Sequence, residues 1–312
     1  MPAPAFEWFY IDMHIPDGHD LVVALHTRPF NSIFDIVICD VHLYKDNEVL
    51  LHEFAVRPRE SLIRDETPFT LRCGDDIRFS REGGGVQLSI RDTRFDLDID
   101  MENLLPGQAP LEAELLAEPA PGRSFRWIVH APHCRGTATL ASGGQSWRLK
   151  GTGYHDANDG TIHFKRDLER WTWGKYYLGD ELLIYGEIFP RRGRRRDVLV
   201  HVTPDGAVLD DAPRIERQGD AVTLHSRVGE MELVRRDAHL IDDIRFYMAT
   251  LPAALRPLAK AIEVAAHFPT ARPALKAVQR RLTNVHYRRF RTVDTVNGKY
   301  LATAFHEEML FT

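Results

Sequence analysis

The sequence has few cysteines and no long apolar run, and both absences exclude classes of protein. The three cysteines, Cys39, Cys73 and Cys134, are odd in number and form no CxxC pair, so we predict neither a disulfide framework nor a cysteine zinc site. No stretch approaches the ~20 apolar residues that a membrane-spanning helix needs. The start, MPAPAFEWFY, lacks the basic and apolar regions of a signal peptide. These features predict a cytoplasmic protein in a reducing compartment.

An excess of positive charge and several common catalytic motifs are also missing. The 40 Lys and Arg residues are outnumbered by 45 Asp and Glu residues, so we expect no nucleic-acid partner. The chain contains no GxSxG, GxxxxGK, complete GxGxxG or HExxH motif. His130, His133 and Cys134 form an isolated HxxHC pattern without a second cluster, and we interpret it as a plain loop. The sequence predicts no metal site and no cofactor.

What is present is the pattern of antiparallel β-sheet. The 312 residues suffice for about two domains of ~150 residues each, and 44% hydrophobic with 27% charged residues are ordinary values for a globular protein. From residue 7 to about 240, short runs alternate apolar and polar residues between turn signals. In the first run, Trp8 and Tyr10 share one face, while Phe9 and Ile11 share the other. Such spacing is typical of β-barrels and sandwiches.

Two further features divide the chain. A dense basic turn follows Pro190, and we place a domain boundary there, between an N-terminal β-domain of residues 1–190 and a C-terminal β-domain of residues 191–312. Within residues 245–283, apolar residues recur at helical spacing. We therefore predict an all-β protein with two barrel-like units and a helical insertion in the second.

Polar and aromatic side chains concentrate between Gly151 and Tyr177. If residues 153–158 are extended, one face carries Tyr154, Asp156 and Asn158, and the other carries His155 and Ala157, followed by Asp159. Alternation also places Trp171, Trp173, Lys175 and Tyr177 together. Two interpretations stay open: these residues carry the chemistry, or the aromatic rings fill a barrel and Asp156 stabilises a turn.

Three motifs carry a resemblance to a known family. They are Glu7-Trp8-Phe9-Tyr10, the pattern G-x-x-Y-x-D-x-N-x-G from Gly151 to Gly160, and W-x-W-G from Trp171 to Gly174. With them the chain resembles the carotenoid 1,2-hydratase, or hydroxyneurosporene synthase, family of lipocalin-like proteins, which includes lipocalin-like cyclases. The resemblance implies two lipocalin-like β-units, an apolar pocket for a long hydrophobic substrate, and Asp156 as proton donor to an isoprenoid double bond. This chain has Asp159 where the hydratases usually have Trp.

The residues themselves suit that chemistry. A carboxyl group in a dry pocket stays neutral at pH 7, because burial disfavours the charged form. Asp159 would raise the pKa of Asp156 further if the turn at Gly160 brought them together, although a regular strand points them apart. His155 and Lys175 either tune the acid, accept the final proton or satisfy buried partners, and we favour the structural role. Candidate aromatic faces for a carbocation are Trp8, Tyr10, Trp127, Trp171, Trp173, Tyr177 and Tyr185.

Three functions remain in view. The first is a cofactor-free enzyme that protonates an isoprenoid alkene through Asp156 and directs hydration or cyclisation. The second is a pericyclic cyclase whose pocket only folds a polyene. The third is a carrier of hydrophobic ligands.

Residues 251–291 contain nine Lys or Arg and one acid, Glu263. Basic amphipathic helices bind anionic membrane surfaces. Peripheral membrane contact and a solvated helix face are equal alternatives for this segment.

Overall fold

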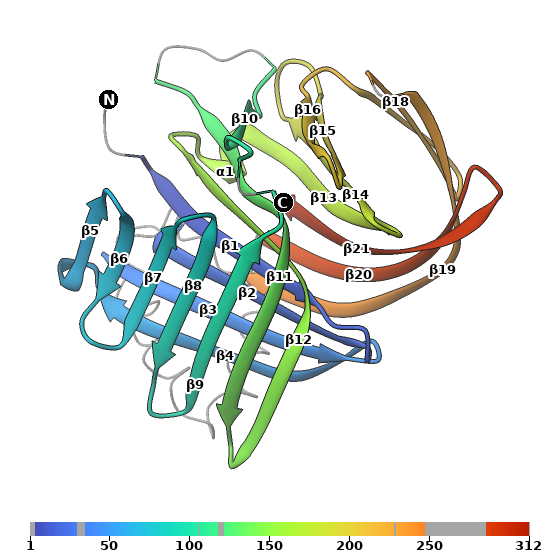
Figure 1. Cartoon of the computed structure of the whole chain (residues 1–312). Helices are drawn as coiled ribbons and strands as arrows, with labels where there is room; N and C mark the ends of the chain where they lie inside the picture. The colour runs from blue at the N-terminus through green and yellow to red at the C-terminus, as the bar shows by residue number, and fades with distance from the viewer. Residues whose placement is uncertain are drawn as a thin grey trace.

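The computed structural model describes residues 4–29, 35–105, 107–117, 122–227, 229–246 and 285–311, and it consists almost entirely of antiparallel strands in two sheets (Figure 1). The first sheet contains β1 (Phe6–His14), β2 (His19–Arg28), β3 (Ile36–Lys45), β4 (Glu48–Pro58), β5 (Leu62–Glu66), β6 (Phe69–Cys73), β7 (Ile77–Glu82), β8 (Gly85–Arg91), β9 (Phe95–Asn103), β10 (Leu111–Glu114), β11 (Phe125–Ser142) and β12 (Gln145–Gly160). The second contains β13 (Leu168–Leu178), β14 (Glu181–Pro190), β15 (Arg196–Thr203), β16 (Gly206–Asp210), β17 (Arg214–Gln218), β18 (Ala221–Ser226), β19 (Gly229–Phe246), β20 (Val285–Val296) and β21 (Tyr300–Phe311).

The two sheets have the same connectivity. In the first sheet the opening strand β1 pairs with the closing strand β12, and the two free edges are the consecutive strands β4 and β5, which the 3₁₀ turn Arg59–Ser61 connects. In the second sheet β13 pairs with β21, and the edges are again consecutive, β16 and β17. Each unit is therefore a barrel-like meander whose first and last strands meet. The all-β class and the two lipocalin-like units predicted from the sequence are confirmed.

The change from the first sheet to the second occurs earlier in the chain than the basic turn after Pro190. The hairpin β13–β14 belongs to the second sheet, and the chain passes from one sheet to the other between Gly160 and Leu168, through the single helical turn α1 (Phe164–Asp167). The predicted domain boundary, between residues 1–190 and 191–312, stays a prediction.

Two predictions about local structure need correction. Strand β19 runs to Phe246, so the first two residues of the predicted helical insertion are strand, and residues 247–283 lie outside the described residues. The HxxHC pattern is not a loop, because it lies inside β11.

Strand β1 faces two different cores. Trp8 and Tyr10 belong to a cluster built from both sheets, whereas Phe9, Ile11 and Met13 belong to the core of the first unit. Strand β13 behaves in the same way, with Trp173 in the shared cluster and Tyr176 in the core of the second unit. One face of each strand thus packs in the core of its own unit, and the other face packs in the interface between the two units. This interface holds most of the aromatic side chains that were named as candidates from the sequence.

A buried ion pair links the two sheets. The ammonium of Lys175 on β13 donates to the carboxylate of Asp12 on β1, and both side chains are buried. Burial raises the pKa of Asp12, while the charge of Lys175 and its hydrogen bond oppose the rise. Breaking such a pair leaves one charge buried without compensation.

We expect Asp12→Ala to lower the free energy of unfolding by about 3–5 kcal/mol, because Lys175 would stay buried without its partner. Chemical denaturation followed by far-UV circular dichroism measures the change. The double variant Asp12→Asn with Lys175→Met, which removes both charges at nearly unchanged volume, should recover most of the loss. A loss of only a few tenths of a kcal/mol for the single variant would show that the pair is not a structural link.

Three arginines of the basic segment, residues 251–291, form ion pairs within the protein. Arg288 binds Glu308, Arg289 binds Glu307, and Arg291 binds Asp20. The other six cations of residues 251–291 lie outside the described residues, and with them the predicted membrane contact. No helix within the described ranges is long and apolar enough to cross a membrane.

Candidate active site

Strand β12 places Asp156 between the sheets. It pairs with β1 on one side and β11 on the other, so residues 153–159 are extended and alternate strictly between two faces. The glycines at both ends of the motif have a steric role. A Cβ at Gly151 would collide with the carbonyl oxygen of His14, and one at Gly160 would collide with that of Ser124. Close packing of neighbouring backbones therefore explains why the motif begins and ends with glycine.

The carboxyl group of Asp156 accepts hydrogen bonds from three side chains. Its Oδ2 accepts the hydroxyl of Tyr154 at 2.6 Å and the indole N–H of Trp127 at 2.8 Å. Its Oδ1 accepts the amide of Asn158 at 3.0 Å. All four side chains are buried. Because Oδ2 already accepts two hydrogen bonds, a proton on this carboxyl group is carried best by Oδ1.

The surroundings favour the protonated form of Asp156. Burial raises the pKa of Asp156 to about 7, and the charges of Asp12 and Glu307 add to the rise, while the hydrogen bonds from Tyr154 and Trp127 oppose it. A large fraction of the protein molecules therefore hold Asp156 as a neutral acid at pH 7. Burial also raises the pKa of Tyr154 well above its usual range, so this residue donates as a neutral phenol.

Asp156 lines a pocket between the two sheets. The space between its walls is about 700 Å³, a figure that includes open solvent at its mouth. Its apolar wall is largely aromatic and comes from both sheets: Trp8, Leu115, Trp127, Trp171, Trp173, Ile188, Val198 and Met309. The pocket is thus formed by the packing of one unit on the other.

The remaining wall of the pocket includes charged and polar side chains. Arg289 on β20 donates from Nε to Glu307 on β21 at 2.9 Å, and both are buried. Tyr10 donates its hydroxyl to the same carboxylate at 3.2 Å, and Asp40 of β3 also faces the pocket. An apolar substrate that extends past the tryptophans therefore meets polar groups on the other side.

Most of the predicted site residues meet at this pocket. Trp8, Tyr10, Trp127, Asp156, Asn158, Trp171 and Trp173 line it, and Tyr154 supports Asp156 from behind. The indole N–H of Trp173 is buried and has no acceptor within the described ranges of the chain. The pocket thus contains the carboxyl group of Asp156, the buried carboxylate of Glu307, the partly buried carboxylate of Asp40 and several electron-rich rings.

Asp159 and His155 lie on the opposite face of β12, as strand alternation requires. Asp159 forms two hydrogen bonds with Arg126, at 2.8 and 2.6 Å, and does not approach Asp156, so the predicted carboxyl pair is wrong. His155 is buried in the first unit, where its Nδ1 donates to the carbonyl of Tyr10 at 2.8 Å. Burial lowers the pKa of His155 well below its usual range. Neither residue can act on a ligand in the pocket from these positions.

Three further candidate site residues also lie away from the pocket lining. Lys175 is engaged with Asp12, and Tyr177 packs beside it with the Lys175 ammonium 5.1 Å from its ring centre. Tyr185 points to the other face of β14, into the core of the second unit, where its hydroxyl lies 2.9 Å from Nδ1 of His306. The predicted placement of Tyr185 is wrong, because Gly186, its neighbour in the chain, is the residue that faces the pocket. Glu7 pairs with Arg64 at 2.7 Å.

Asp40, Arg289 and Glu307 line the pocket but were not predicted as site residues from the sequence. Each of them is a polar residue on a strand, at a position that alternation assigns to a buried face. That signal was available, but only the packing of the two sheets shows that these residues share a pocket with Asp156.

Comparisons with known proteins agree with the motifs. Residues 103–255 match the family model of the carotenoid hydratase CrtC, and these residues include the motif around Asp156 and W-x-W-G. An acyclic carotenoid 1,2-hydratase from Cereibacter sphaeroides is 36% identical over 83 residues, which are 27% of this chain and 29% of that protein. The enzyme of the same name from Rhodobacter capsulatus is 27% identical over 151 residues, which are 44% of this chain and 53% of that protein. The chain thus spans about half or less of the length of these relatives.

Solved structures share the fold over almost the whole chain. CghA matches with a TM-score of 0.67 at 9% identity, covering 99% of this chain and 89% of CghA. Kievitone hydratase from Nectria haematococca matches with a TM-score of 0.51 at 11% identity, covering 99% and 89%. At these identities the likeness concerns the fold alone. Over residues 103–255, the chain is thus similar to the carotenoid hydratase CrtC family, as its motifs predicted.

Proposed function

We propose that this protein is an enzyme that adds a proton from Asp156 to an isoprenoid alkene and directs the resulting cation to hydration or cyclisation. The observation that carries the proposal is a buried carboxyl group with a pKa of about 7 in a tryptophan-lined pocket. The names of the curated relatives favour an acyclic, polyene-like substrate and hydration as the reaction.

The reaction balances with this single acid. The alkene π electrons take the proton from Oδ1 of Asp156, which leaves a carboxylate and a carbocation. In hydration, water adds to the cation and then loses a proton, which returns to Asp156. In cyclisation, an internal alkene attacks instead, and a carbon next to the final cationic carbon loses a proton to the same carboxylate, which leaves a new double bond. No cofactor is needed for the proton transfer itself.

The pocket walls suit a short-lived cation. Trp8, Trp171 and Trp173 provide electron-rich faces, and an indole is the best aromatic partner for a positive charge. The carboxylate left on Asp156 is stabilised by the donors Tyr154, Trp127 and Asn158 noted above, so charge separation is supported on both sides. The indole N–H of Trp173 offers a position for a substrate oxygen or the attacking water, since buried donors are normally paired.

Isotope labels distinguish the possible reactions. The protein would be incubated with acyclic carotenoids and shorter isoprenoid alkenes in D₂O and, separately, in H₂¹⁸O, and products analysed by mass spectrometry. Hydration predicts one solvent deuterium on carbon and one ¹⁸O, whereas proton-initiated cyclisation predicts deuterium without ¹⁸O. A pericyclic cyclase would incorporate neither label. A carrier would bind the compounds and return them unchanged, and either of these last two results would refute the proposal.

A further inference from the structure

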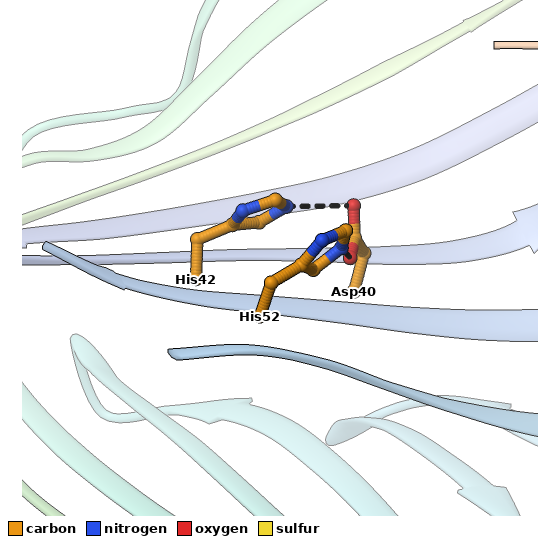
Figure 2. Close-up of side chains that lie close together, drawn as sticks. All are labelled: Asp40, His42 and His52. Carbon is orange, nitrogen blue, oxygen red and sulfur yellow. Dashed lines mark hydrogen bonds and ion pairs between the residues drawn. The ribbon is translucent and has the colours of Figure 1, made fainter. Parts of the chain in front are cut away.

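A second cluster of ionisable side chains lies on the hairpin β3–β4, at the edge of the first sheet. Asp40 and His42 are two residues apart on β3 and therefore point to the same face. His52 on β4 is the direct cross-strand partner of His42. Figure 2 shows the result: the two imidazole rings stack, and both turn toward the carboxylate of Asp40.

The donor atoms of this cluster are close enough together to share one ion. Nε2 of His42 lies 3.0 Å from one carboxylate oxygen of Asp40, and Nε2 of His52 lies 2.8 Å from the other. One donor atom from each of the three residues lies within 4.8 Å of the other two. Ligand atoms around a tetrahedral Zn²⁺ are about 3.3 Å apart, given metal–ligand bonds of roughly 2.0–2.1 Å. Small side-chain movements would therefore admit an ion.

The second nitrogen of His42 faces another carboxylate. Its Nδ1 lies 3.3 Å from Oδ2 of Asp242 on β19, and the same oxygen accepts the hydroxyl of Tyr44 at 2.8 Å. Arg289 adds a contact to Asp242 at 4.0 Å. Metal-binding histidines almost always present their other ring nitrogen to a carboxylate or carbonyl, which fixes the tautomer and the ring orientation. His42 is buried, its Nε2 forms a hydrogen bond with Asp40, and its Nδ1 faces the carboxylate of Asp242.

We propose that Asp40, His42 and His52 bind a divalent transition-metal ion, with Zn²⁺ as the reference case. Two imidazoles and one carboxylate suit Zn²⁺ and its first-row neighbours better than Mg²⁺ or Ca²⁺, which prefer all-oxygen sites. Three protein ligands leave a coordination position for water or a ligand, as in catalytic zinc sites. The side chain of His52 is 42% exposed, which gives an ion access from solvent. Asp40 also lines the pocket, so the ion would lie beside the cavity.

This metal site goes beyond the proposed function, and an experiment can refute it without refuting the proposed function. Proton transfer from Asp156 requires none of the three ligands, and the two sites share only the pocket wall at Asp40. Zinc binding is therefore measured on the protein alone, without a substrate.

The test uses the chain without a histidine tag, stripped of metal and titrated with Zn²⁺ by isothermal calorimetry. We expect one ion per chain. His42→Ala and His52→Ala should each weaken binding at least tenfold, and Asp242→Asn should weaken it by roughly 10–100-fold, the usual effect of losing the partner of a ligating histidine. His201→Ala is the matched control, since His201 also contacts a carboxylate, Glu181 at 2.7 Å, but belongs to no such group in the described parts of the chain. It should bind like the wild type.

Co²⁺ provides an independent measurement, because Co²⁺ bound by four ligands absorbs visible light. The wild type should show this absorption, and His52→Ala should lose it. His52 is the most exposed of the three residues, so its variant reports even if His42→Ala does not fold. Zn²⁺ affinity that is unchanged in a folded His52→Ala variant, or that falls equally in His201→Ala, would overturn the proposal. In that case the cluster is a hydrogen-bonded His-Asp-His group only.

Discussion

Replacing Asp156 by Asn is expected to reduce turnover by roughly 10²–10⁴-fold, the usual contribution of a general acid, while ligand binding stays nearly unchanged. The amide has the shape of the carboxyl group and can still accept hydrogen bonds from Tyr154 and Trp127. It has no proton that it can transfer to an alkene. The effect should therefore appear in kcat, measured at saturating substrate, and not in the dissociation constant measured by quenching of tryptophan fluorescence.

The matched control is Asp159→Asn, which makes the same chemical change three residues along the same strand. Asp159 lies on the other face of β12 and pairs with Arg126, so we expect near-normal turnover and at most a small loss of stability. Far-UV circular dichroism would verify that both variants fold. An Asp156→Asn variant with only mildly reduced turnover would favour a pericyclic cyclase, and an equal loss in both variants would show that the acid is not specific to Asp156.

The fold was predictable wherever alternation was regular. Period-2 patterns located strands such as β1 and β13 and the correct side for Trp8 and Trp173, because one face of each strand must be buried. Short strands with many charged residues escaped, among them β5 (Leu62–Glu66) and β17 (Arg214–Gln218). Such strands are held by pairing with their neighbours, which a local pattern does not report. The pairing of β1 with β12 and of β13 with β21 is non-local for the same reason.

The site was predictable only where its residues are close in sequence. Tyr154, Asp156 and Asn158 occupy alternate positions of one strand, so their meeting follows from geometry alone. Glu307 meets Asp156 through packing between sheets, across about half the chain, and no local rule links them. The metal cluster needed the register of the β3–β4 hairpin, which places His52 opposite His42. The prediction about Asp159 was wrong for a different reason. The resemblance drew attention to this position, although strand alternation already placed Asp159 on the face opposite to Asp156.

The pH dependence of the chemical step is expected to show a single descending limb with a midpoint near pH 7. Asp156 must be protonated to act, and burial has raised its pKa to about 7, so the rate should be level at lower pH and fall as the carboxyl group ionises. Well above the midpoint the fall approaches about tenfold per pH unit. Single-turnover measurements over the range in which the protein stays folded would avoid contributions from product release.

Tyr154→Phe tests whether this limb belongs to Asp156. The hydroxyl of Tyr154 donates to the carboxylate and lowers the pKa of Asp156, so its removal should raise that pKa and move the limb to higher pH, even if the plateau rate also falls. Asp159→Asn should leave the midpoint where it is in the wild type. A rate that stays level to pH 9, or a limb that moves to lower pH in Tyr154→Phe, would mean that another group supplies the proton or that no proton is transferred in the rate-limiting step.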